Sequence, residues 1–159
     1  MKEILKNLYI GNDVDCSTTG LHFFIIHTCK TCHQNGVGYR GNLSSNHPYY
    51  LIYESANHLF LNIVDMDREL LVKFTHPIIQ SALVFIRKHI KEQKILIHCN
   101  MGQSRSPSIG LIYLAQNNII SCNSYSSAKV EFSEIYSDYL PGKGIALYLQ
   151  KNWEDILKL

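Results

Sequence analysis

The chain has 159 residues, of which 46% are hydrophobic and 18% charged, and its formal net charge is +2. These values predict a globular protein, which we interpret as one domain over residues 1–159, and they exclude a disordered chain. The net charge is too small to argue for a nucleic-acid or membrane partner, and we expect neither. No apolar stretch reaches the length of a membrane span and the first residues do not form a secretion signal, so we expect a cytoplasmic protein.

The first third of the chain predicts two short strands and a long loop. An apolar run that ends at Gly11 indicates a first strand and turn, and residues 22–27 form a second apolar strand. Residues 28–57 are rich in Gly, Asn and Ser, which is typical of a loop. Within that loop we expect only a short helical piece near residues 50–54.

The middle third alternates strands with a helix. Residues 59–64 form a third apolar strand, and residues 65–69 form a polar loop. Apolar residues then recur at helical spacing through residues 71–91, with the helix proper expected to start near Pro77. A fourth apolar strand follows at residues 95–97. This alternation predicts an α/β fold with a mostly parallel central sheet flanked by helices.

The last third predicts helices only. Residues 126–136 form one helical segment, residues 139–145 form a turn, and residues 145–157 form an amphipathic helix. In mostly parallel sheets, ligands bind beyond the carboxyl ends of the strands. Asp65, Asp67 and Cys99 all follow predicted strand ends, so we expect them to converge there.

Two cysteines and two histidines lie close together after the second strand. His27, Cys29, Cys32 and His33 have side chains that bind zinc, and Cys-x-x-Cys-His is also the spelling of a c-type haem attachment site. Structural zinc sites usually combine two such ligand pairs, and no second pair follows along the chain. Haem attachment needs export, for which we find no signal. The sequence therefore predicts no metal and no cofactor.

The stretch from residue 94 to residue 114 carries the strongest functional signal. Five residues separate Cys99, which follows the fourth strand, from Arg105, and Pro107 suits the first turn of a helix. A compact turn from strand to helix points backbone N–H groups into one concavity, and the helix N-terminus adds positive potential. A cysteine thiolate in such an anion cradle is suited to nucleophilic attack on phosphorus.

These residues carry a resemblance to a known family. His98-Cys99-x5-Arg105-Ser106, with Gly102 inside the loop, resembles the signature loop of the cysteine-dependent protein tyrosine phosphatases. The Ser-Pro-Ser continuation resembles the dual-specificity branch, as does the order of elements over nearly the whole chain, and the chain is similar to short microbial and phage members. The resemblance implies that phosphotyrosine, and also phosphoserine or phosphothreonine, in proteins is the substrate.

The resemblance also implies roles for the loop residues. Cys99 would be the nucleophile that forms a phosphocysteine, Arg105 would bind the phosphoryl oxygens, and Ser106 would stabilise the thiolate when the intermediate breaks down. The loop amides would bind phosphate together with Arg105; they belong to Asn100, Met101, Gly102, Gln103 and Ser104. No metal is needed for this chemistry.

The family further requires an aspartic acid that protonates the leaving oxygen. The spacing Ile63-x-x-x-Asp67 favours Asp67, whereas the Leu-Asn-x-Val-Asp form found in short microbial and phage relatives favours Asp65. The sequence leaves these two candidates open.

Other activities remain as alternatives. The same scaffold also serves phosphoinositide and RNA 5′-phosphate hydrolysis, but the signature loop here has no cation between Cys99 and Arg105 to bind additional phosphates. A phosphate-binding module without turnover is a further alternative, and the presence of both residues argues against it. The sequence does not define the physiological substrate or the oligomeric state.

Overall fold

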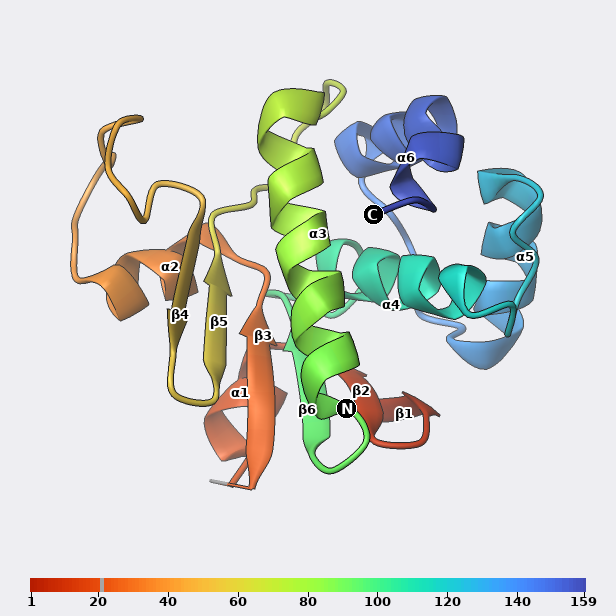
Figure 1. The fold of residues 1–159 in the computed structure, drawn as a ribbon, viewed down its shortest axis with the longest axis horizontal. Coiled ribbons are helices and arrows are strands. Elements are labelled where there is room, and N and C mark those ends of the chain that lie inside the picture. The colour runs from red at the N-terminus through yellow and green to blue at the C-terminus, as the bar shows by residue number, and fades with distance from the viewer. Residues whose placement is uncertain (21) are drawn as a thin grey trace.

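The computed structural model describes residues 1–20 and 22–159 and contains one six-stranded sheet (Figure 1). The strand order is β1-β2-β6-β3-β5-β4. The strands are β1 (Lys2–Leu5), β2 (Leu8–Gly11), β3 (Phe23–His27), β4 (Ile52–Ser55), β5 (His58–Leu61) and β6 (Lys94–His98).

The four inner strands are parallel and the two edge strands are antiparallel to their neighbours. β6 lies in the middle, and its Ile95, Leu96 and Ile97 are completely buried, as an apolar run without alternation requires. β1 and β2 form a hairpin whose turn holds Asn7 at φ 68°, a conformation that Asn tolerates better than most residues. The predicted α/β fold with a mostly parallel sheet is confirmed.

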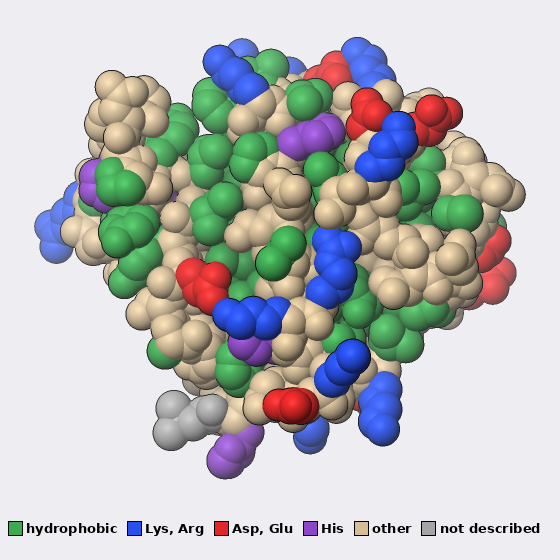
Figure 2. Space-filling view, in the orientation of Figure 1, with side chains coloured by type: hydrophobic (Ala, Val, Ile, Leu, Met, Phe, Trp, Pro, Cys, Tyr) green, Lys and Arg blue, Asp and Glu red, His purple; other side chains and the backbone are tan. Residues whose placement is uncertain are grey.

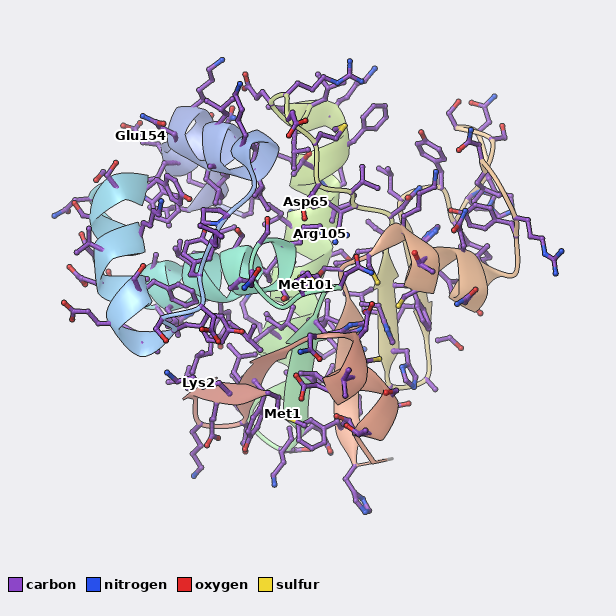
Figure 3. The ribbon with its side chains drawn as sticks, turned by 180° about the vertical axis from the view of Figure 1, so that it is seen from behind. Met1, Lys2, Asp65, Met101, Arg105 and Glu154 are labelled. Atoms are coloured by element: carbon purple, nitrogen blue, oxygen red, sulfur yellow. The ribbon has the colours of Figure 1, made fainter. Side chains whose placement is uncertain are left out.

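Helices cover both faces of the sheet. Figures 1 and 3 show α3 on one face, with α1 and α2 on the other. The helices are α1 (Asp13–Thr18), α2 (Lys30–Val37), α3 (Val72–His89), α4 (Arg105–Gln116), α5 (Tyr125–Ile135) and α6 (Lys143–Ile156). On the face that carries α3, acidic and basic side chains are interspersed with hydrophobic ones, without a large patch of one charge (Figure 2).

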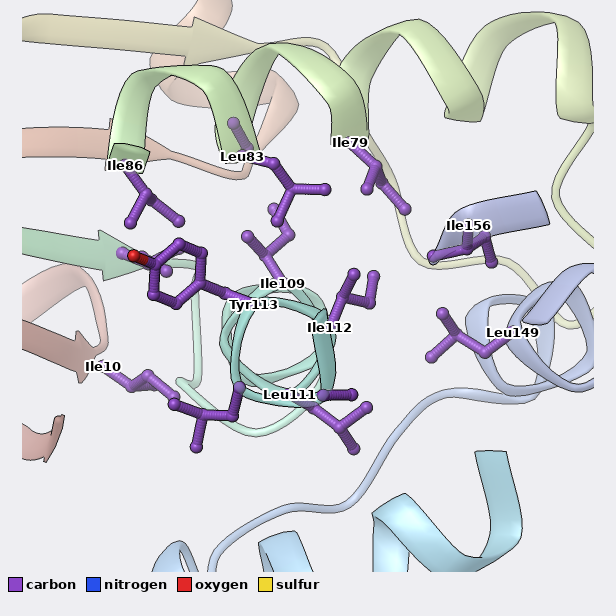
Figure 4. Packing of buried hydrophobic residues seen from close by; sticks show 14 of the residues in the cluster. Ile10, Ile79, Leu83, Ile86, Ile109, Leu111, Ile112, Tyr113, Leu149 and Ile156 are labelled. Carbon is purple, nitrogen blue, oxygen red and sulfur yellow. The ribbon is translucent and has the colours of Figure 1, made fainter. Parts of the chain in front are cut away.

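The helix α4 is the centre of the packing. All its residues from Arg105 to Ala115 are buried, so it is covered by other elements around its whole circumference instead of having one exposed face. Figure 4 shows α4 between α3 and α6: Ile112 lies among side chains such as Leu83 and Leu149. Burying each such side chain contributes about 1.5–3 kcal/mol. Because α4 begins at Arg105, this packing fixes the end of the signature loop rigidly.

The structure corrects the prediction for residues 28–57. An eight-residue helix, α2, occupies Lys30–Val37, and the expected helical piece near residues 50–54 is instead strand β4. α2 is a polar helix without an apolar stripe, so the sequence pattern did not reveal it. Its Gly36 packs against Phe60, because a Cβ at this position would lie 2.9 Å from the Phe60 ring. β4 is stabilised by its pairing with β5, which no local pattern reveals.

Two helix starts also differ from the prediction. α3 begins at Val72, so Pro77 lies inside it, although proline removes one helical hydrogen bond. Packing holds this turn, since His76 Nδ1 lies 2.7 Å from the Tyr148 hydroxyl of α6. α6 begins at Lys143, two residues before the predicted start.

A short N-terminal helix, α1, was not predicted at all. It is capped by Asn12, whose side chain accepts hydrogen bonds from Val14 and Asp15 N–H groups. Across the described part of the chain, no helix combines the length and the hydropathy that crossing a bilayer requires.

Candidate active site

The signature loop joins the carboxyl end of β6 to the start of α4 and is held in a tight curve. Gly102 has φ 71°, and a Cβ at this position would lie 3.0 Å from the Gly11 carbonyl oxygen. The Tyr136 hydroxyl donates a 2.8 Å hydrogen bond to the Gly102 carbonyl oxygen, and Leu140 N–H donates a 2.9 Å bond to that of Gln103. Burial raises the pKa of Tyr136 to about 12, so its hydroxyl remains a donor at neutral pH.

Cys99 lies at the base of the loop with 1% of its surface exposed. The hydroxyl of Ser106, in the first turn of α4, lies 3.2 Å from the Cys99 sulfur and can donate a hydrogen bond to it. The same hydroxyl lies 3.4 Å from the Gly11 carbonyl oxygen. Ser106 is completely buried, so its position relative to the sulfur is fixed by packing.

Arg105 uses three guanidinium nitrogens for three separate contacts. Nη1 donates to the Ile63 carbonyl oxygen at 3.2 Å, and Nη2 donates to Asn100 Oδ1 at 2.6 Å. Nε donates to Asp65 Oδ2 at 3.0 Å. The guanidinium therefore ties the signature loop to the loop that follows β5.

The two candidate acids occupy different environments. Asp65 lines the pocket above Cys99; besides its contact with Arg105, it accepts a 2.8 Å hydrogen bond from the Ser104 hydroxyl. Figure 3 shows Asp65 and Arg105 side by side, with Met101 nearby. Both residues are exposed, but Asp67 does not line that pocket.

The Asp65 loop is held in place by α6. The Gly144 N–H donates a 2.8 Å hydrogen bond to the Met66 carbonyl oxygen, and a Cβ at Gly144 would collide with the backbone of Met66 and Arg68. The first turn of α6 therefore fits against the loop that carries Asp65. Glycine is required at position 144 for this close approach.

The pocket has a volume of about 250 Å³ and an apolar rim. Met101 and Leu140 are 70% and 71% exposed and both line it. The full lining is Asp65, Cys99, Met101, Gln103, Ser104, Arg105, Leu140 and Gly142. Of the five expected amide donors, Met101, Gln103 and Ser104 line the pocket, whereas Asn100 and Gly102 complete the loop behind it.

Residues 140–142 also contribute to the pocket. Leu140 lines the pocket, and the Gly142 N–H donates a 2.9 Å hydrogen bond to the Ser104 hydroxyl, which itself contacts Asp65. The turn at residues 139–145 was predicted, and its hydrogen bonds to Gln103 and Ser104 join it to the signature loop.

Three buried or half-buried histidines extend from the signature loop across the sheet. His98 Nε2 lies 2.8 Å from His27 Nδ1, and His27 Nε2 lies 2.9 Å from His58 Nδ1. Burial lowers the pKa of His98, and burial together with His98 and His58 lowers the pKa of His27 to about 3. These imidazoles are therefore neutral at physiological pH.

The histidines and cysteines considered as a local zinc site separate in the fold. His33 lies on α2 with its Nδ1 3.0 Å from the Tyr39 hydroxyl, and in the described part of the chain it joins no cluster of candidate ligands. Cys29 and Cys32 instead approach His98, which belongs to β6.

The comparisons with known proteins identify the family of the chain. The sequence profile described as "Dual specificity phosphatase, catalytic domain" matches residues 24–131, more than half of the chain. The chain therefore belongs to the dual-specificity phosphatase family, and the predicted family is confirmed.

Individual proteins of this family are also similar to the chain in sequence or in structure. The chain is 42% identical over 72 residues to the dual specificity protein phosphatase YVH1 of Plasmodium falciparum, a match that covers 45% of the chain and 12% of that much longer protein. Among solved structures, it resembles the human tyrosine phosphatase-like serine/threonine/tyrosine-interacting protein, with a TM-score of 0.68, 22% identity and coverage of 100% and 98% of the two chains.

A second solved structure has a similar fold. The phosphatase domain of Yvh1 from Chaetomium thermophilum has a TM-score of 0.62 and 17% identity, with coverage of 95% of this chain and 92% of that one. At these identities the structural likeness establishes the fold and no more.

Proposed function

We propose that this chain hydrolyses phosphate monoesters of phosphotyrosine, and also of phosphoserine and phosphothreonine, in proteins. The observation that carries the proposal is the pocket lined together by Cys99, Arg105 and Asp65. A nucleophile, a phosphate-binding fork and a carboxylic acid are the three groups that phosphoryl transfer to a thiol requires.

In the first step, the Cys99 thiolate attacks phosphorus. The sulfur–phosphorus bond forms as the bond to the leaving oxygen breaks, and Asp65 gives its proton to that oxygen. The N–H groups of the loop and the Arg105 guanidinium stabilise the charge on the three equatorial oxygens of the transition state.

In the second step, water attacks the phosphocysteine. Asp65, now a carboxylate, accepts the water proton, and the sulfur leaves as a thiolate. The Ser106 hydroxyl, 3.2 Å from that sulfur, donates a hydrogen bond to the departing charge. The cycle uses no metal and no other cofactor.

Two features favour a protein substrate over a phosphoinositide. Within the described residues, Arg105 is the only cationic side chain that lines the pocket, so additional phosphates would find no second cation inside it. A second hollow of about 300 Å³ lies on the other side of the Asp65 loop; most of its lining is apolar, such as Ile63 and Phe74, although Lys30 and Arg68 also line it. It can accept an apolar side chain next to the phosphorylated residue.

The apolar rim favours phosphotyrosine. Met101 and Leu140 present exposed apolar side chains at the pocket mouth, where they can contact both faces of an aromatic ring. All five cysteines are free thiols, so we also propose the reducing cytoplasm as the working compartment.

The test compares one peptide sequence phosphorylated on tyrosine or on threonine, alongside a soluble phosphoinositide headgroup. We expect kcat/KM for the phosphotyrosine peptide to exceed that for the phosphothreonine peptide by at least about tenfold, which corresponds to ~1.4 kcal/mol. A higher kcat/KM for the phosphoinositide than for either peptide would overturn the assignment of a protein substrate.

A further inference from the structure

A cluster of three cysteines and two histidines lies directly behind the signature loop. β3 and β6 are parallel neighbours with His27 opposite His98 in register, so both imidazoles lie at the same level of the sheet. Cys29 is the N-cap of α2 and Cys32 is in its first turn, so the helix brings both thiols to the end of β3. Cys16 comes from α1, on the same face of the sheet as α2 (Figure 3).

Two overlapping groups of candidate ligand atoms share His98. The Cys29 and Cys32 sulfurs and a His98 ring nitrogen all lie within 4.8 Å of one another. The Cys16 sulfur forms a second such group with ring nitrogens of His27 and His98. We propose that Cys29, Cys32 and His98 bind one Zn²⁺ ion. The fourth ligand is the side chain of His27 or of Cys16.

The distances fit a tetrahedral zinc ion after small shifts. Bonds of about 2.3 Å to sulfur and 2.0–2.1 Å to nitrogen set a sulfur–nitrogen separation of about 3.6 Å. The Cys32 sulfur lies 3.9 Å from His98 Nε2. His27 Nδ1 lies 2.8 Å from His98 Nε2, so its hydrogen bond to His98 has to open for the metal to bind.

The environment of His98 also matches that of a zinc ligand. Zinc-bound histidines usually donate their second ring N–H to a carboxylate or carbonyl oxygen. His98 is completely buried, and its Nδ1 has no hydrogen-bond partner, yet Asp13 Oδ1 lies only 3.4 Å away. With the metal on Nε2, a small closure lets Nδ1–H donate to Asp13, and the unpaired buried atom is satisfied.

The charges balance as well. Two thiolates from Cys29 and Cys32 neutralise Zn²⁺ and the neutral His98 imidazole adds no charge, so the ion and these three ligands carry no net charge. The ion would connect the β3–α2 corner to the residue that precedes the nucleophile. Its role is therefore to hold the signature loop in place, separate from the phosphoryl transfer itself.

This proposal departs from the sequence-based expectation that no metal binds. That expectation rested on the absence of a second ligand pair near Cys29 and Cys32 along the chain. The parallel pairing of β3 with β6 brings His98 to them from about seventy residues away.

The primary test is the metal content of the purified, reduced protein. After dialysis against a chelator and reconstitution with Zn²⁺, we expect one equivalent of tightly bound zinc. Replacing zinc with Co²⁺ should give an intense sulfur-to-cobalt charge-transfer absorption, which requires thiolate ligands. No bound metal, or cobalt bound without this absorption, would overturn the proposal.

Variants assign the ligands. We expect Cys29→Ser and Cys32→Ser to lose stoichiometric zinc, whereas Cys122→Ser, which changes the same atom outside the cluster, should retain it. If these variants misfold, alkylation of the wild-type protein replaces them. Zinc should then protect Cys29 and Cys32 but leave Cys122 reactive, and equal reactivity with and without zinc would contradict the site.

Discussion

Asp65 binds Arg105 Nε, one of the two guanidinium nitrogens with which Arg105 could contact a phosphate in a bidentate manner. Its Oδ2 accepts a 3.0 Å hydrogen bond from Arg105 Nε, while its Oδ1 accepts one from the Ser104 hydroxyl. An arginine binds phosphate best through two N–H groups at once, and Nη2 is engaged by Asn100 in the same structure. A phosphoryl group that contacts this edge through two N–H groups competes with Asp65 for Nε and with Asn100 for Nη2. In the proposed mechanism, the displaced Asp65 carboxyl group then serves the leaving oxygen.

The first prediction concerns Asp65→Asn. Removing the acid should slow substrates with poor leaving groups far more than nitrophenyl phosphate, and it should flatten the basic limb of the pH profile of kcat/KM. Because Asn binds the guanidinium less strongly than a carboxylate, tungstate should bind this variant at least as tightly as the wild type. Steady-state kinetics across leaving groups, with calorimetric titration of tungstate, measure both effects.

Asp67→Asn is the matched control for that variant. Asp67 is exposed and does not line the pocket, so its replacement should leave the leaving-group dependence unchanged. If Asp67→Asn showed the larger effect, the general acid would be Asp67. Equal and mild effects would mean that the proton comes from another residue.

A second prediction concerns Arg105→Lys. Lysine keeps the charge but has one nitrogen in place of the three that contact Ile63, Asn100 and Asp65. We expect kcat/KM to fall on the order of 10²–10³-fold, the usual cost of losing one transition-state donor, or by more. Activity within a factor of two of the wild type would show that phosphate is bound elsewhere.

Ser106→Ala should separate the two chemical steps. A hydrogen bond to a charged group contributes about 1.5–3 kcal/mol, so loss of the Ser106 hydroxyl should slow thiolate departure roughly 10–100-fold. Formation of the phosphocysteine should change little. Rapid mixing with nitrophenyl phosphate should then show a burst of nitrophenol, followed by slow turnover; a linear time course without a burst would contradict this role.

The curvature of the signature loop gives a prediction for Gly102→Ala. This position has φ 71° and no space beside Gly11, so the loop has to shift, and activity should fall with a stability loss of about 1–3 kcal/mol. Gly41→Ala is the control, because Gly41 has a similar φ of 74° but nothing within 4 Å. Equal loss of activity in both variants would show that the close contact does not matter.

Local patterns were sufficient to predict the loop between β6 and α4 and the central strands. The run from β6 to α4 is contiguous in sequence, so its apolar strand, Cys99, Arg105 and helix start are all visible without tertiary information. Prediction was poorest where pairing or packing decides the structure. β4 depends on β5, and the turn before Pro77 depends on Tyr148.

The distinction between the two acids also needed the fold. Asp65 and Asp67 are two residues apart in one polar loop, and sequence spacing supports either. Their environments differ because Gly144 holds the Met66 carbonyl and Arg105 holds Asp65. Likewise, His98 approaches Cys29 and Cys32 only through the strand order.

The measurement that tests the central claim most directly compares catalysis and oxyanion binding in Cys99→Ser. Serine keeps the shape of the residue and the loop donors, but its hydroxyl is a poor nucleophile without a base. The account predicts no detectable hydrolysis of a phosphotyrosine peptide together with tungstate affinity close to that of the wild type. Substantial hydrolysis by the folded variant would contradict the assignment of Cys99 as the nucleophile.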